Sequence, residues 1–201
     1  LLKNRKFQFK IKKNIPQQAG LGGGSMNAAS ILSFLIKKKI IKTNKKTLSY
    51  IANYVGSDVA LGLKTSNSIM LSNNKILRIK NYKRYFVLVV KPNFGCSTKY
   101  VYSKVKRFVK PFFYIKKKKL FDMKNLKKLK NGLEEVVFKS HPKLKKVKTI
   151  MEKLNEPLFV RMSGSGSVLV AYYYSKNACN KARSKFIRQF KNYWCITSKT
   201  I

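Results

Sequence analysis

The hydrophobic and polar positions of the N-terminal part of the chain repeat first with the period of a strand and then with that of a helix. Residues 7–13 (FQFKIKK) alternate apolar and polar side chains, which predicts a half-buried strand. Residues 25–39 carry apolar side chains at helical spacing and lysines near their end, so they predict a helix with Ser25 as its N-cap. Residues 44–56 predict a second helix that ends at Gly56.

The rest of the chain alternates strand and helix patterns, beginning with a loop and short strand. In chain order we expect a loop with a short strand over 57–74, a strand over 85–92 and a helix over 97–108 capped by Ser97 or Thr98. A lysine-rich insert over 110–130 and helical residues 133–155, interrupted near Pro142, follow. The chain then continues with a strand, glycine turn and strand over 158–174, a helix over 177–190 and a strand over 193–197. This order predicts an α+β fold. We place the domain boundary near residues 75–84 and divide the chain into 1–80 and 81–201.

The composition is that of a globular chain with a core, because 44% of its 201 residues are hydrophobic and 12% are aromatic. The apolar runs are shorter than the roughly 18 residues that cross a bilayer, so we expect no membrane segment. The first ten residues are too charged for a signal peptide, and because the chain starts at Leu1 we expect an N-terminal portion to be missing. The cysteines Cys96, Cys179 and Cys195 lack metal-ligand spacing, which favours reduced thiols in a cytoplasmic protein.

The net charge of +40 would attract any polyanion, so a basic nucleic-acid-binding protein is an alternative that composition raises. Two observations weigh against it. The chain has 39 lysines and 7 arginines, although arginine is the preferred reader of phosphates and base edges. Neither an aromatic RNA-binding motif nor an arginine-rich helix face is present. We therefore expect solvated lysine faces and a surface position for His141, the only histidine.

The strongest chemical signal is the glycine-rich segment PQQAGLGGGS over residues 16–25, between the expected strand and the expected helix. Glycines let backbone amides face a ligand, and the helix that follows adds free N–H groups and a positive dipole end, which together suit phosphates. A flexible linker is the alternative. A Walker A loop is excluded because no lysine follows the glycines. A Rossmann loop is excluded because Ser25 replaces its last glycine and the next acid, Asp58, lies 34 residues beyond Gly24.

Three segments together resemble the motifs of the GHMP kinase family. The segment PQQAGLGGGSMNAAS is similar to the family's phosphate loop, P-x-x-x-G-L-G-[GS]-[GS]-S. VGSDVALGL over 55–63 resembles the segment that carries the catalytic aspartate, and RMSGSGSVLVAYY over 161–173 resembles the third motif. The resemblance covers essentially the whole chain. It implies a ribosomal-protein-S5-like N-terminal domain over 1–80, which we expect to be incomplete, and a ferredoxin-like α/β plait over 81–201.

The resemblance also implies an activity. ATP would donate a phosphoryl group, with Mg²⁺, to the 2-hydroxyl of a cytidine-diphosphate ester of methylerythritol (CDP-methylerythritol) in non-mevalonate isoprenoid biosynthesis. Asp58 would accept the proton of that hydroxyl, although a solvated or ion-paired role is the alternative when Asp58 is taken alone. Ser25 would be the metal-proximal residue, and Lys13 would flank the adenine. The residues expected to bind ATP are Lys13, Pro16, Gln17, Gln18, Ala19, Gly20, Leu21, Gly22, Gly23, Gly24, Ser25, Met26 and Asn27, and those near the acceptor are Ser163, Gly164, Ser165 and Gly166.

The sequence departs from the family pattern in ways that keep other interpretations open. The family's motif P-x-K-[IL]-N, whose lysine pairs with the catalytic aspartate, and its nearby histidine-containing segment are absent, so we expect this chain alone to be inactive. Met26 stands where a second serine is usual, and Ala60 where proline is usual. A homoserine, mevalonate or galactose type of GHMP kinase would share the loop. A homodimer is left open, and a nucleic-acid-binding protein stays the alternative from another class.

Overall fold

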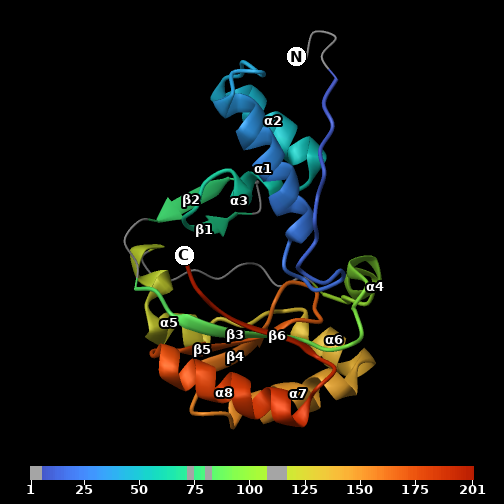
Figure 1. The fold of residues 1–201 in the computed structure, drawn as a ribbon, viewed down its shortest axis with the longest axis vertical. Helices are drawn as coiled ribbons and strands as arrows, with labels where there is room; N and C mark the ends of the chain where they lie inside the picture. Colours follow the sequence, from blue (N-terminus) through green and yellow to red (C-terminus); the bar gives the residue numbers. More distant parts are fainter. Residues whose placement is uncertain (1–5, 72–74, 80–82, 108–116) are drawn as a thin grey trace. The chain divides into compact units, whose positions relative to one another are not determined.

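The computed structural model describes residues 6–71, 75–79, 83–107 and 117–201, which form two compact units (Figure 1). The first unit comprises Leu1–Ile15, Gly22–Tyr82 and Ile201, and the second comprises Pro16–Leu21 and Lys83–Thr200. The glycine-rich segment is therefore divided between the two units, at the bond from Leu21 to Gly22. The domain boundary expected between residues 80 and 81 lies outside the described residues.

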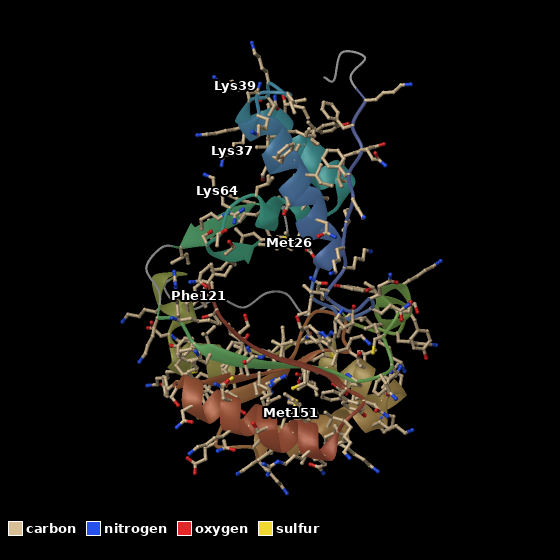
Figure 2. The ribbon with its side chains drawn as sticks, viewed as in Figure 1. Met26, Lys37, Lys39, Lys64, Phe121 and Met151 are labelled. Carbon is tan, nitrogen blue, oxygen red and sulfur yellow. The ribbon has the colours of Figure 1, made fainter. Side chains whose placement is uncertain are left out.

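The first unit consists of helices and a two-stranded sheet. Its elements are α1 (Gly23–Lys37), α2 (Lys45–Val55), α3 (Val59–Gly62), β1 (Asn67–Met70) and β2 (Ile76–Ile79). The strands β1 and β2 pair antiparallel, with Asn67 opposite Ile79 and Met70 opposite Ile76. Figure 2 labels Met26 in the first turn of α1 and Lys37 and Lys39 at its other end. The buried face of α1 carries Ala29, Leu32 and Leu35, because these positions recur at helical spacing.

The predicted helix over 44–56 is confirmed, whereas two other expectations in this unit are wrong. Helix α2 begins after Asn44, whose Oδ1 accepts the N–H of Thr47 at 2.8 Å, and it ends at the C-cap Gly56. Helix α1 begins at Gly23, so its N-cap is Gly22 and not Ser25. Residues 7–13 form no strand and are exposed, because alternation gives a strand two faces but supplies no partner for its backbone.

The second unit is an antiparallel sheet with helices. Its elements are β3 (Phe86–Lys91), α4 (Thr98–Ser103), the 3₁₀ helix η1 (Lys117–Phe121), α5 (Met123–Lys128), α6 (Glu134–Ser140), α7 (Pro142–Glu152), β4 (Phe159–Met162), β5 (Leu169–Tyr173), α8 (Lys176–Gln189) and β6 (Trp194–Lys199). The strand order is β4-β5-β3-β6, and every neighbouring pair is antiparallel. This connectivity is the expected ferredoxin-like plait, with additional helices between β3 and β4.

The two faces of this sheet are covered differently. Helices α7 and α8 cover one face (Figure 1), and the largest buried cluster lies there, with Leu88 and Val90 of β3 packed against residues such as Met151, labelled in Figure 2. Because successive strand residues point to opposite faces, Val87 and Val89 face the other way. They pack with Ala19 and partly buried Leu21. The start of the glycine-rich segment is thus anchored on the second face of the sheet.

The secondary-structure predictions for this half are confirmed for the strands and the long helices. The helix over 97–108 is shorter than expected, since α4 ends at Ser103, and its cap is Ser97, whose Oγ accepts the N–H of Tyr100. The break near Pro142 separates α6 from α7. The lysine-rich insert over 110–130 contains η1 and α5, while its residues 110–116 lie outside the described part.

Two further findings concern expectations made from composition. Within the part of the chain that the structure describes, no helix combines the length and apolar character that a bilayer crossing needs. Cys96, Cys179 and Cys195 are free thiols, as expected. Burial raises the pKa of Cys179 and of Cys195 to about 11, so these two thiols stay protonated at neutral pH and behave as apolar packing groups.

Candidate functional site

The glycines of the first unit form the start of α1. Gly22 is the N-cap and has a φ of 63°, a left-handed conformation that favours glycine. The first backbone bond of the helix runs from the N–H of Met26 to the carbonyl of Gly22 at 2.9 Å. The amides of Gly23, Gly24 and Ser25 precede that bond, so the helix does not use them. A Cβ added at Gly23 or Gly24 would meet nothing within 4 Å. This helix start offers backbone donors and open space to an anion.

Asp58 lies beside this helix start. It is the N-cap residue of α3 and is exposed. A Cβ built on Gly22 would lie 4.0 Å from Oδ2 of Asp58, so the carboxylate is close to the N-terminal end of α1. Helix α3 reaches this position because it packs closely on α1, where a Cβ at Gly62 would come within 2.7 Å of Ala29. Two separate sequence motifs therefore meet within one unit.

Arg78 on β2 fixes the other end of α3. Its guanidinium donates to the backbone carbonyls of Ala60 at 2.5 Å, Leu61 at 2.9 Å and Lys64 at 2.7 Å. These carbonyls lie at the C-terminal end of a short helix, where a cation satisfies both the orphan acceptors and the negative dipole end. Burial lowers the pKa of Arg78 below its ordinary value, but a guanidinium stays charged at any physiological pH. Sequence analysis did not single out Arg78.

The other half of the glycine-rich segment is held by the turn between β4 and β5. The N–H of Val168 donates to the carbonyl of Ala19 at 3.2 Å, and the N–H of Ser167 donates to that of Gln18 at 3.3 Å. The hydroxyl of Ser163 donates to the carbonyl of Gly20 at 2.8 Å. The third predicted motif therefore binds the first one, residue by residue, within the second unit.

Gly20 has to be a glycine at this contact. Its φ of 69° is left-handed, and a Cβ there would collide with the carbonyl of Ser163 and come within 2.9 Å of the carbonyl of Gly166. Gly95 has a similar role, since a Cβ there would collide with the side chain of Gln18. Gln18 itself has a positive φ of 50°. The path of the loop is thus fixed by the close approach of its own backbone at Gly20, and of the Gln18 side chain, to neighbouring backbone.

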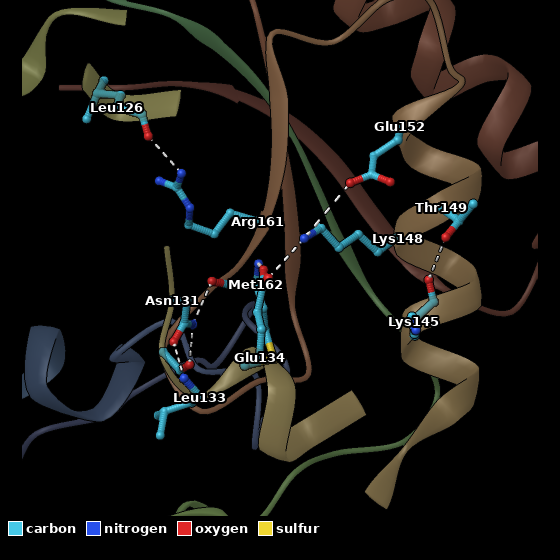
Figure 3. Close-up of polar contacts among 11 residues, drawn as sticks. Leu126, Asn131, Leu133, Glu134, Lys145, Lys148, Thr149, Glu152, Arg161 and Met162 are labelled. Atoms are coloured by element: carbon cyan, nitrogen blue, oxygen red, sulfur yellow. Dashed lines mark hydrogen bonds and ion pairs between the residues drawn. The ribbon is translucent and has the colours of Figure 1, made fainter. Parts of the chain in front are cut away.

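The turn over residues 163–166 is in turn held by side chains that sequence analysis did not recognise as part of the site. Asn131 donates its amide to the carbonyls of Met162 and Gly164, and Glu134 accepts the N–H of Met162 (Figure 3). The hydroxyl of Ser165 lies 2.8 Å from that of Thr98. No side-chain pattern in the sequence marks Glu134, because its partner in this turn is a backbone N–H.

Cys96 packs against the same turn without the character of a nucleophile. A Cβ at Gly166 would lie 3.3 Å from its sulfur. Burial raises the pKa of the Cys96 thiol, and the charge of Lys91 only partly opposes this effect. In the described segments, no group of three or more histidine, cysteine, aspartate or glutamate side chains could hold a metal ion by itself. Any metal here would need ligands from a bound molecule.

The remaining predicted residues lie at different depths. Lys13, Gln17 and Met26 are exposed, and Asn27 is half-buried on α1. Pro16 is half-buried, and Ala19 is buried against the sheet. Their predicted roles in binding ATP stay predictions.

Comparison with protein families assigns both halves of the chain to one class. The model described as GHMP kinases N terminal domain matches residues 1–70, and the one described as GHMP kinases C terminal matches residues 116–192. Together with the relatives described next, these matches show that the chain belongs to the GHMP kinase family. It is therefore a kinase, and its two compact units carry the fold expected for that class.

The relatives narrow the class to one enzyme name. The chain is 56% identical over its whole length to the 4-diphosphocytidyl-2-C-methyl-D-erythritol kinase of Pelagibacter ubique and spans 72% of that protein. It is 36% identical to the enzyme of the same name from Petrotoga mobilis, over 84% of this chain and 69% of the relative. A crystal structure of 4-(cytidine 5'-diphospho)-2C-methyl-D-erythritol kinase matches 94% of this chain and 69% of its own, with a TM-score of 0.73 and 25% identity. A homoserine kinase from Cytophaga hutchinsonii, at 14% identity and a TM-score of 0.59, shares the fold alone.

Proposed function

We propose that the protein transfers the γ-phosphoryl group of ATP to the 2-hydroxyl of CDP-methylerythritol, a step of isoprenoid precursor synthesis. The observation that carries the proposal is the position of Asp58 beside the start of α1 within one unit. A hydroxyl acceptor needs a group that takes its proton, and a phosphoryl donor needs fixed donors for its oxygens. In the first unit, the Asp58 carboxylate could take the proton, and the free amides at the start of α1 could bind the phosphate oxygens. The names of the relatives support the choice of acceptor.

The nucleotide phosphates would lie on the backbone amides from Gly20 to Ser25. The open space at Gly23 and Gly24 fits this use, because phosphate oxygens approach amides more closely where no Cβ intervenes. The dipole of α1, a helix of 15 residues, adds to the attraction. Lys13 and Asn27 remain the candidates for contacts with the rest of the nucleotide.

Asp58 would act as the proton acceptor. Its carboxylate is exposed and not used as a side-chain cap for α3, so an oxygen is available to a substrate hydroxyl. Arg78 would keep α3 in place while Asp58 takes the proton. The nucleophile is then the acceptor oxygen itself, which attacks the γ-phosphorus as ADP leaves.

A Mg²⁺ ion bound with the nucleotide would fit at the start of α1. It prefers oxygen ligands and is held in kinases by one or two protein oxygens together with substrate phosphates. The hydroxyl of Ser25 in the first turn of α1 is an oxygen donor of this kind. When bound with the nucleotide, the ion would neutralise charge on the phosphates.

The turn over residues 163–166 would approach the acceptor through its backbone. The hydroxyl of Ser163 is already used by Gly20 and that of Ser165 by Thr98, and Gly164 is the exposed residue of the four. We therefore assign the contact with the acceptor to the backbone of Gly164.

Three broader assignments complete the proposal. The chain is divided near residue 80 into a nucleotide-binding domain and a C-terminal domain. The protein acts on a small molecule in the cytoplasm, where free thiols such as its own are kept reduced.

The test compares Asp58→Asn with a matched control, Asp122→Asn, in the full-length protein. Asp122 is also the N-cap residue of a short helix and makes no side-chain cap bond, but it belongs to α5 in the second unit. Loss of a proton acceptor should lower kcat by about 10²- to 10⁴-fold in Asp58→Asn, while Asp122→Asn keeps the wild-type rate. Full activity of Asp58→Asn, in an assay that follows ADP formation with CDP-methylerythritol, would show that Asp58 is not the base.

A further inference from the structure

We propose that Asn131 and Glu134 are positioning residues that fix the turn over residues 163–166, and through Ser163 set the conformation of Gly20 for ATP. This inference rests on the proposed function, since it assumes that the glycine-rich segment binds nucleotide phosphates. All the residues involved belong to the second unit. They come from the segment before α6, from the start of α6, from the end of β4 and the turn after it (Figure 3), and from the glycine-rich segment.

The side chain of Asn131 bridges the backbone on both sides of Ser163. Its Nδ2 donates to the carbonyl of Met162 at 2.9 Å and to that of Gly164 at 2.8 Å. Its Oδ1 accepts the N–H of Leu133 at 2.9 Å, which orients the amide. A side-chain amide has two N–H donors, and both donors of Asn131 form hydrogen bonds with this one turn.

Glu134 holds the same backbone from the N–H side. Its Oε1 accepts the N–H of Met162 at 2.6 Å, and its Oε2 accepts Lys148 Nζ at 2.9 Å. Strand β4 is at the edge of the sheet, so an outward N–H of this strand has no ladder partner unless a side chain supplies one. The side chain of Glu134 is 16% exposed, against 80% for Glu135. A shielded, charge-assisted bond of this kind holds geometry better than a solvated one.

Ser163 links the turn to the glycine-rich segment. Its backbone is bracketed by the bonds to Met162 and Gly164, and its hydroxyl donates to the carbonyl of Gly20 at 2.8 Å. Gly20 is held in a left-handed conformation by the same contact surface. If these hydrogen bonds to the backbone of Met162 and Gly164 are lost, the loop samples other conformations. The apparent affinity for ATP then falls in proportion to the fraction of molecules whose loop keeps the binding conformation. The rate at saturating concentrations of both substrates changes much less.

The decisive substitution is Asn131→Asp, because it keeps the shape and the acceptor for Leu133 but removes both donors to the turn. We expect the KM and the Kd for ATP to rise about tenfold, with kcat at saturating concentrations of both substrates nearly unchanged. Glu134→Gln keeps one acceptor and should have a smaller effect in the same direction. Glu134→Ala should match Asn131→Asp.

Two control variants carry the same chemistry away from the turn. Asn125 donates its amide to the carbonyl of Lys119, and Glu135 pairs with Lys139 at an exposed position. Asn125→Asp and Glu135→Gln should leave the Kd for ATP at the wild-type value. Thermal unfolding of each variant separates a loss of stability from a loss of affinity.

The positioning role can be tested independently of the proposed acceptor, because the Kd for ATP is measured by titration calorimetry without acceptor. A folded Asn131→Asp protein with the wild-type Kd would overturn the inference, and so would a variant that loses only stability. If Asn131→Asp does not fold, Glu134→Gln decides by the same criterion. If the wild type binds ATP but does not phosphorylate CDP-methylerythritol, the proposed acceptor is wrong while the variant series still decides the positioning role. A wild type that binds no ATP would overturn both.

Discussion

The glycines between residues 20 and 24 have different surroundings, although the sequence shows them as one run. Gly20 touches the backbone of Ser163 and Gly166, while Gly24 has open space around the place of a Cβ. At Gly20 a side chain is excluded by protein atoms. At Gly24 the protein leaves room, and we expect the phosphates of ATP to use it.

This difference predicts opposite effects of the same substitution. Gly20→Ala should lower the free energy of unfolding by about 1–3 kcal/mol, because the new Cβ meets backbone at a positive φ. Gly24→Ala lies in a helix and should leave that free energy unchanged or raise it by about 0.5–1 kcal/mol, while it weakens ATP binding. Thermal or denaturant unfolding and ATP titration of both variants check this. Unchanged ATP affinity in Gly24→Ala would argue against phosphates at the start of α1.

Single residues also show where sequence reasoning stops. Asp58 could be found because its neighbours form a motif in the sequence. Glu134 could not, because its partner is the backbone N–H of Met162, 28 positions further along the chain. An N–H is present at nearly every residue, so no side-chain pattern marks the one that lies at the edge of a sheet. The same applies to Asn131.

At the scale of elements, periodicity predicted the parts that are buried and failed where burial is decided elsewhere. Strand β3 and helices α7 and α8 were predicted because one face of each packs into the core. The alternation over residues 7–13 marks two faces, yet these residues are exposed and unpaired within the described structure. Strand β2 was missed because four residues give too short a pattern.

The short helix α3 gives a prediction at this scale. Four residues cannot hold a helix by their own hydrogen bonds, so α3 depends on packing against α1 and on the guanidinium of Arg78. Arg78→Ala should destabilise the protein by about 1–3 kcal/mol, since three carbonyls lose a charged donor. It should also lower kcat, because Asp58 begins this helix.

The control for that variant is Arg84→Ala, which removes the same side chain from an exposed position. Urea unfolding and initial rates at saturating substrates measure both effects. If Arg78→Ala lost stability but kept the wild-type kcat at a temperature where it is folded, Arg78 would hold the fold without positioning Asp58.

For the whole molecule, the order of three motifs carried more information than the charge. The net charge of +40 is a property of surfaces, and the described ion pairs gather on α6 and α7, between Glu134, Glu135 or Glu152 and nearby lysines. Charge alone would have favoured a polyanion as partner. The loop, the Asp58 segment and the 163–166 turn indicated a kinase, and the family matches confirm that class. Which residues contact each substrate stays a prediction.

The measurement that tests the central claim most directly is the choice of acceptor. The full-length protein is supplied with ATP and Mg²⁺ and, separately, with CDP-methylerythritol, homoserine, mevalonate or galactose, and ADP formation is followed while ³¹P NMR identifies the product. The account predicts a phosphate ester on the 2-hydroxyl of CDP-methylerythritol and a kcat/KM roughly 10²-fold or more above that of the other alcohols. An equal or faster transfer to another acceptor, or no transfer by a preparation that binds ATP, would contradict it.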